Sequence, residues 1–172
     1  MFLPLFSTSQ TPELSFINEV NLVRTNPAKY CQYIKEYLSG YVDTSRKRIA
    51  NEELIPLLLS MSPLKPLLES DTLTKMLDKH KVDSIKNEVH HDLTWLNIKN
   101  KQISENIVMS TTNNYRQSVI LLLIDSYDSK RGHRLNILNP NVTHTAVKRV
   151  SFGNEKKPFT CRIYWIQEFV EF

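Results

Sequence analysis

The most informative stretch of the chain runs from Leu122 to Pro140 and reads LLIDSYDSKRGHRLNILNP. It continues a nearly uninterrupted apolar run, Ser118–Ser126, whose periodicity fits a buried helix or a buried strand equally well. Two ionisable residues stand out, Asp125 and His133. Taken alone, Asp125 is most often a helix cap or an ion-pair partner, and His133 could simply hydrogen-bond a backbone carbonyl. The surrounding pattern therefore has to decide their role.

The chain on either side of this stretch has the composition of β-strands. Thr143–Phe152 and Thr160–Phe169 are rich in β-branched and aromatic residues, and residues 153–158 between them contain glycine and proline. This pattern predicts a β-hairpin. Glu105–Ser110, which precedes the stretch, is short and compatible with a further strand.

The first half of the chain is predicted to be helical. A Thr-Pro pair at residues 11–12 is a typical N-cap and first-turn pair, and apolar residues then recur at helical spacing. An Asn-Pro pair at residues 26–27 ends this helix and opens a second one, which stops at Gly40. Another helix is expected over Asp71–Ile85, whereas residues 41–62 are mixed and polar, typical of a connection.

Composition and order together predict a soluble α+β domain. Helices precede the strands without βαβ alternation, 41% of the residues are hydrophobic and 23% are charged. At 172 residues we expect one domain over residues 1–172, with residues 1–10 as a flexible or packing extension. The net charge of +4 comes from scattered short basic runs, which favour a solvated surface and no nucleic-acid partner; a weak attraction to anionic lipid headgroups stays open.

Cysteines and the chain start bear on the compartment. Cys31 and Cys161 lie among apolar neighbours and are predicted to be buried and unbridged. Residues 1–6 are apolar but contain a proline and lack a basic segment, so no signal peptide is recognised. The sequence as it stands is expected inside the cell, and a chain trimmed at its start would be secreted. No apolar run approaches the ~18 residues of a transmembrane helix.

Several segments resemble the CAP superfamily (cysteine-rich secretory proteins, antigen 5 and pathogenesis-related 1), an SCP-type domain. GHRLNILNP at residues 132–140 is similar to the late signature of the family, and its RGHR form resembles the bacterial and protist branch. FINEVNLVRTNP, at residues 16–27, resembles the first helix of the family, Leu73–Ser84 its next helix, and SENI at residues 104–107 its Gly-Glu-Asn-Ile element. The resemblance therefore spans nearly the whole chain.

This resemblance implies a fold and a cleft. The fold is a three-layer α-β-α sandwich with a mainly antiparallel central sheet, in which the Ser118–Ser126 run is a helix. The cleft carries two histidines and two carboxylates, and some family members hold a divalent metal there. Transferred onto this chain, the cleft residues are His90 or His91, Glu105, Asp125 and His133.

Zinc is the metal that such a set would suit, with His91 and His133 as its ligands. The two histidine positions at 90 and 91 stay open, with His91 favoured. The family usually has Glu at the position of Asp125. The two arginines beside His133, Arg131 and Arg134, are expected to hold the loop, since a guanidinium readily bonds carbonyls or carboxylates.

Three functions compete for such a domain. A non-catalytic module would bind a lipid, a sterol, a peptide or a protein partner, and it is favoured because no serine or cysteine stands in a motif with the histidines. A metal-dependent hydrolase would use the same cleft, with Glu105 as the base. A signalling or structural domain would have a vestigial cleft. The fold by itself does not choose among them.

Overall fold

The computed structural model describes residues 10–40, 42–79, 101, 103–157 and 160–171. Four strands form one sheet in the order β1-β3-β4-β2. Strand β4 pairs antiparallel with β3 on one side and with β2 on the other. The two-residue strand β1 pairs with β3 in parallel. The strands are β1 (Leu68–Glu69), β2 (Ile103–Ser110), β3 (His144–Phe152) and β4 (Arg162–Val170).

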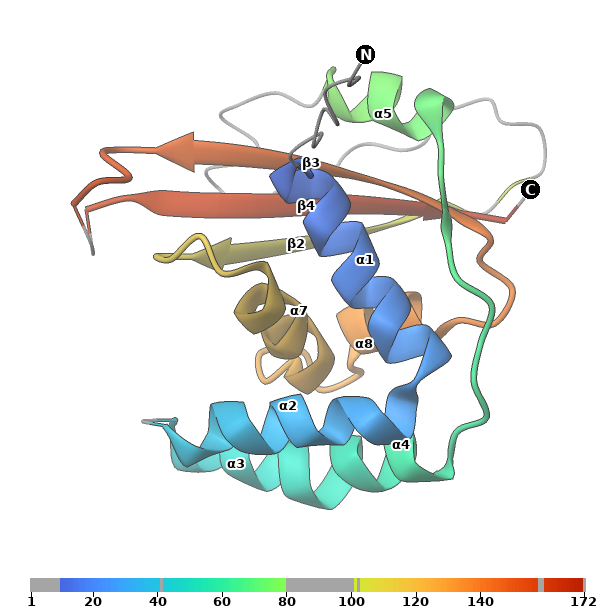
Figure 1. Cartoon of the computed structure of the whole chain (residues 1–172), viewed down its shortest axis with the longest axis vertical. Coiled ribbons are helices and arrows are strands. Elements are labelled where there is room, and N and C mark those ends of the chain that lie inside the picture. The colour runs from blue at the N-terminus through green and yellow to red at the C-terminus, as the bar shows by residue number, and fades with distance from the viewer. Residues whose placement is uncertain (1–9, 41, 80–100, 102, 158–159, 172) are drawn as a thin grey trace, which may run out of the picture.

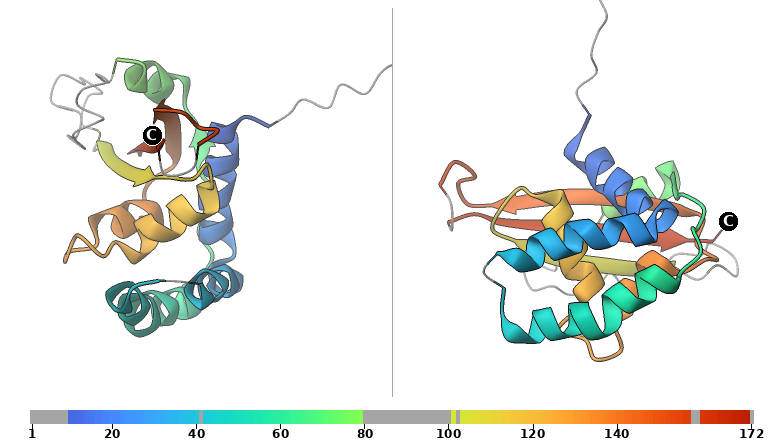
Figure 2. Two further views of the ribbon diagram at one scale, coloured as in Figure 1. Left: turned by 90° about the vertical axis from the view of Figure 1, so that its left-hand side faces the viewer. Right: turned by 60° about the horizontal axis from the view of Figure 1, so that its bottom comes forward.

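Helices cover both faces of this sheet, which confirms the α-β-α sandwich (Figure 1). One face carries α5, and the other carries α1, α7 and α8, with α2, α3 and α4 packed farther out (Figures 1 and 2). The helices are α1 (Pro12–Thr25), α2 (Pro27–Ser39), α3 (Thr44–Ile49), the π-helical segment η1 (Ala50–Leu54), α4 (Ile55–Ser60), α5 (Asp71–Leu77), α7 (Tyr115–Ile124) and α8 (Gly132–Leu138).

The alternation of side chains along β4 divides the core into two parts. Trp165 is buried against the large helical layer and stacks on Phe16 of α1, with 5.0 Å between the ring centroids. Tyr164 and Ile166 point to the other face and pack beneath α5. Both faces of the strand are therefore buried, and the long apolar run of β4 follows from this.

The prediction of a connection over residues 41–62 was wrong, because residues 44–60 form a nearly continuous helical segment. The chain passes from α3 through η1 into α4, and Pro56 stands in the first turn of α4. Proline normally interrupts an α-helix because it lacks the N–H that would bond four residues back. The wider π-helical turn just before Pro56, in which the Ile55 N–H bonds the Ala50 carbonyl, changes this pattern and accommodates it.

The other expected elements agree with the structure, with shifted ends. Of the helix expected over Asp71–Ile85, the structure shows α5 as far as Leu77, and residues 80–85 lie outside the described residues. The Thr11 hydroxyl caps α1, α2 stops before Gly40, and the Ser118–Ser126 run lies in α7. Cys31 and Cys161 are both buried and free, as predicted. No described helix is long and apolar enough to cross a bilayer.

Arg24, at the end of α1, is fully buried, and no carboxylate in the part of the chain that the structure describes pairs with it. Its Nε donates to the Lys65 carbonyl at 3.0 Å and its Nη2 to that of Val142 at 3.2 Å. Its Nη1 donates to the carbonyls of Ile137 at 2.7 Å and Asn139 at 2.9 Å. One guanidinium thus joins α1 to the end of α8 and to two connections, and burial lowers its pKa to about 10.

Candidate functional site

Asp125 ends α7 and holds His133 at the start of α8. The Asp125 backbone is left-handed (φ 49°), a conformation that aspartate tolerates better than most residues. One carboxylate oxygen lies 2.9 Å from His133 Nδ1, and the other accepts the His133 backbone N–H, also at 2.9 Å. Asp125 is buried and His133 partly exposed, so the carboxylate fixes the orientation of a reachable imidazole.

The loop between Asp125 and His133 is held by the two arginines. Arg131 makes a two-pronged ion pair with Glu53, at 2.9 and 2.8 Å, and its Nη1 donates to the backbone carbonyls of Asp125 and Asp128. Arg134 donates to the carbonyls of Leu123 and Ile124 and also reaches Glu53. The hydrogen bond from Arg131 is the main cause that lowers the pKa of Glu53 to about 2. The expectation that these arginines hold the loop is confirmed.

Glu105 lies on β2, directly opposite Glu168 of β4, and both side chains are buried. By strand alternation their side chains share the face that packs against α5, with Ile107 and Ile166. Burial, and then the neighbouring charge of Glu105, raise the pKa of Glu168 to about 8. Glu168 therefore keeps its proton at neutral pH. The sequence signal that could have identified Glu168 is a carboxyl side chain within an otherwise apolar strand.

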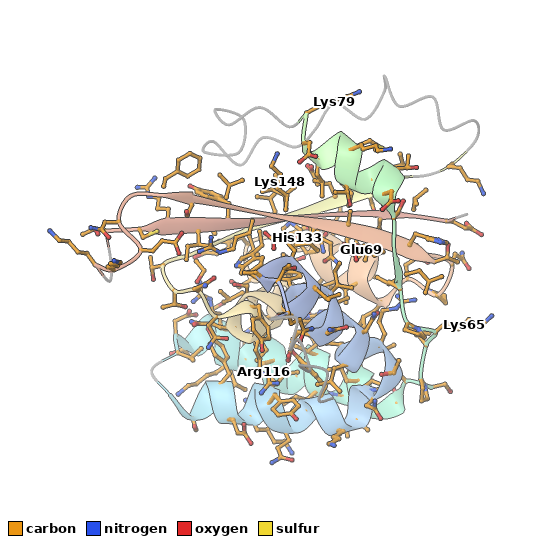
Figure 3. The ribbon with its side chains drawn as sticks, turned by 45° about the horizontal axis from the view of Figure 1, so that its top comes forward. Lys65, Glu69, Lys79, Arg116, His133 and Lys148 are labelled. Carbon is orange, nitrogen blue, oxygen red and sulfur yellow. The ribbon has the colours of Figure 1, made fainter. Side chains whose placement is uncertain are left out.

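The next residue along β2 links the strand to His133. Asn106 alternates to the helical face, where its side-chain amide donates to the His133 carbonyl at 3.1 Å. Asn136 of α8 in turn donates to the Asn106 side-chain oxygen at 2.8 Å. The start of α8 is thereby fastened to the sheet; Figure 3 shows His133 on this side and Lys148 on the side of α5.

A cavity of about 380 Å³ opens beside the Asp125–His133 pair. Its aliphatic walls come from β2 and α7. Its polar part comes from the pair itself, from the loop after α7 and from Arg46 of α3. The lining residues are Arg46, Ile107, Val108, Met109, Leu121, Leu122, Asp125, Ser126, Tyr127 and His133.

The structure thus brings together two of the predicted cleft residues, Asp125 and His133, and places Glu105 on the neighbouring strand. His90 and His91 lie outside the described residues, so the complete four-residue cleft stays a prediction. Within the described ranges, no three His, Cys, Asp or Glu side chains are grouped closely enough to hold a metal ion.

A sequence model of the cysteine-rich secretory protein family, CAP, matches residues 17–169. The chain belongs to this family. No curated protein and no solved structure shows significant similarity to it. The matched range of the CAP domain includes every element of the sandwich except the start of α1 and the last residue of β4, and it includes all predicted cleft residues.

Proposed function

We propose that this CAP domain is a non-catalytic binding module whose ligand is a small lipid-like molecule with an apolar body and a polar end. The observation that supports this most is the cavity beside Asp125 and His133. Its volume of about 380 Å³ falls in the range of small-molecule sites. Such sites combine mostly apolar walls with a few polar groups that fix orientation, and this cavity has that character.

The polar groups of the cavity are better suited to binding a ligand than to catalysing a reaction. Both oxygens of Asp125 accept hydrogen bonds from His133, so this carboxylate orients the ring and caps α8. Ser126 also lines the cavity, yet no hydrogen bond joins it to His133 in the described part of the chain. A serine nucleophile needs a base within hydrogen-bond reach, so an Asp-His-Ser arrangement lacks support.

Filling the cavity is expected to weaken ligand binding. Leu121→Trp places an indole from α7 into the space between α7 and β2, and we expect binding of decan-1-ol and decanoate to weaken at least about tenfold, since the apolar surface they would bury is already covered. Isothermal titration calorimetry measures this. Leu135→Trp is the matched control, because Leu135 is 62% exposed and lines the separate groove between α4 and α8. Equal binding by wild type and Leu121→Trp, or no binding by the wild type, would contradict the proposal.

A metal-dependent hydrolase is the second candidate, and the hydrogen bond between Asp125 and His133 Nδ1 favours it. A carboxylate on one ring nitrogen commonly orients a histidine whose other nitrogen binds a metal. In this reading His133 and His91 are the ligands and Asp125 supports His133 without binding metal itself. A bound Zn²⁺ would supply a water of lowered pKa.

Zinc titration of His133→Ala tests this candidate. We expect a loss of Zn²⁺ affinity of about tenfold or more relative to the wild type, since one ligand is removed. His144→Ala is the control, because His144 lies on β3 beside Thr143 and does not line the cavity. Zn²⁺ binding that is equal in all three proteins, or absent from the wild type, rejects His133 as a ligand.

A further inference from the structure

We propose that the same cavity selects ligands with an anionic head group, a carboxylate or a phosphate, and that Arg46 recognises this charge. The proposal rests on the proposed function, since it specifies the head group of the ligand held there. It also assigns a role in specificity to a residue on α3, far in the sequence from the Asp125–His133 pair.

Arg46 and Tyr127 form the mouth of the cavity. The Arg46 Nη2 donates to the Tyr127 hydroxyl at 3.1 Å, and the guanidinium carbon lies 5.8 Å from the centre of the tyrosine ring. Tyr127 is 92% exposed, whereas Leu122 of α7, which also lines the cavity, is 2% exposed. A ligand with an apolar tail would therefore point the tail toward α7 and leave its head beside Arg46 and Tyr127.

Hydrogen-bond donors at this mouth are available to a head group. Arg46 directs Nη2 to Tyr127 and Nε to Asp43, at 3.3 Å, and within the described chain its Nη1 has no hydrogen-bond partner. The Tyr127 oxygen accepts from Arg46, so its own hydrogen can be donated to a ligand. A guanidinium and a hydroxyl on adjacent elements together match the oxygens of a carboxylate or phosphate.

The acidic residues near this position do not offset the cation. Asp43 caps α3 by accepting the Arg46 backbone N–H, and its carboxylate is about half exposed, so water screens its charge. Among the described residues that line the cavity, Asp125 is the acidic one, and both of its oxygens are directed to His133. The mouth of the cavity is therefore a place where an anion gains more than a neutral alcohol.

Three ligands with the same ten-carbon tail test the proposal by calorimetry: decanoate, decyl phosphate and decan-1-ol. We expect the wild type to bind at least one of the anions about tenfold more tightly than decan-1-ol, because a hydrogen bond to a charged group is stronger than one to a neutral group. Arg46→Gln should remove this preference by weakening the anions while leaving decan-1-ol unchanged. Tyr127→Phe, which keeps the ring and removes the hydroxyl, should weaken the anions less.

Arg48→Gln is the matched control, since Arg48 lies two residues on, is more than half exposed and does not line the cavity. It should bind all three ligands as the wild type does. Equal affinity of the wild type for the alcohol and both anions overturns the role of Arg46 and leaves the proposed function standing. An equal loss of affinity for all three ligands in Arg46→Gln also overturns it, because Arg46 would then shape the mouth of the cavity without distinguishing an anion from a neutral alcohol. Failure of all three ligands to bind the wild type contradicts the proposed function itself.

Discussion

Replacing Arg24 with alanine is expected to lower the free energy of unfolding by about 3 to 5 kcal/mol, the scale seen when a buried charged group is removed from its partners. The guanidinium is fully buried and donates to the carbonyls of Lys65, Ile137, Asn139 and Val142. Its removal leaves these carbonyls without their donor and opens a cavity between α1 and α8. Arg24→Lys should recover only part of the loss, because an ammonium cannot reproduce the planar fork of donors.

Urea unfolding followed by far-ultraviolet circular dichroism measures this change. Arg48→Ala is the control on the same residue type: Arg48 is exposed and ion-paired with Glu52 at 3.5 Å, so its loss should stay within about 0.5 kcal/mol. A loss of less than about 1 kcal/mol for Arg24→Ala would show that the four carbonyls do not depend on Arg24.

Glu168→Gln is expected to stabilise the protein at neutral pH by roughly 3 kcal/mol. In the folded protein burial raises the pKa of Glu168 to about 8 from the ordinary 4.5. Between these two values the folded state keeps a proton that the unfolded chain has released, so the contribution of Glu168 to stability falls as the pH rises from 4.5 to 8 and is constant above 8. Glutamine has nearly the same shape as the protonated carboxyl and carries no such dependence.

Unfolding by urea at a series of pH values from 5 to 9 measures both the gain and the slope. The wild type should lose stability across this window, and Glu168→Gln should lose less. Glu171→Gln is the neighbouring control, because Glu171 is exposed and its replacement should leave the slope unchanged. A slope that is identical in wild type and Glu168→Gln would show that Glu168 ionises normally.

The pH dependence contributed by Glu53 has the opposite sign. Its pKa is lowered to about 2, so its contribution to stability is lost as the pH falls from 4.5 through 2.

Local signals were sufficient to predict much of the fold. The Thr11 cap and the Asn26-Pro27 break mark α1 and α2, since capping and proline chemistry depend on adjacent residues. The composition of the last two strands predicted the hairpin of β3 and β4. The helix through Pro56 was missed because a π-helical turn leaves no known signature in composition. The two residues of β1 form a strand only because β3 lies beside them.

The candidate site was predicted in part, through the family resemblance. That resemblance placed Asp125 and His133 in one cleft, and the structure puts them in hydrogen-bond contact. The partnership of Arg46 with Tyr127 joins residues 81 positions apart, so no local pattern could reveal it. The same holds for Arg24, whose carbonyl partners are up to 118 positions away.

A crystal structure of the protein with decanoate bound tests the central claim most directly. We expect density for the ten-carbon chain between β2 and α7, against Val108 and Leu121, with the carboxylate beside Arg46 and Tyr127. Decanoate in the groove between α4 and α8, with the cavity beside His133 empty, would contradict the assignment of this cavity as the binding site.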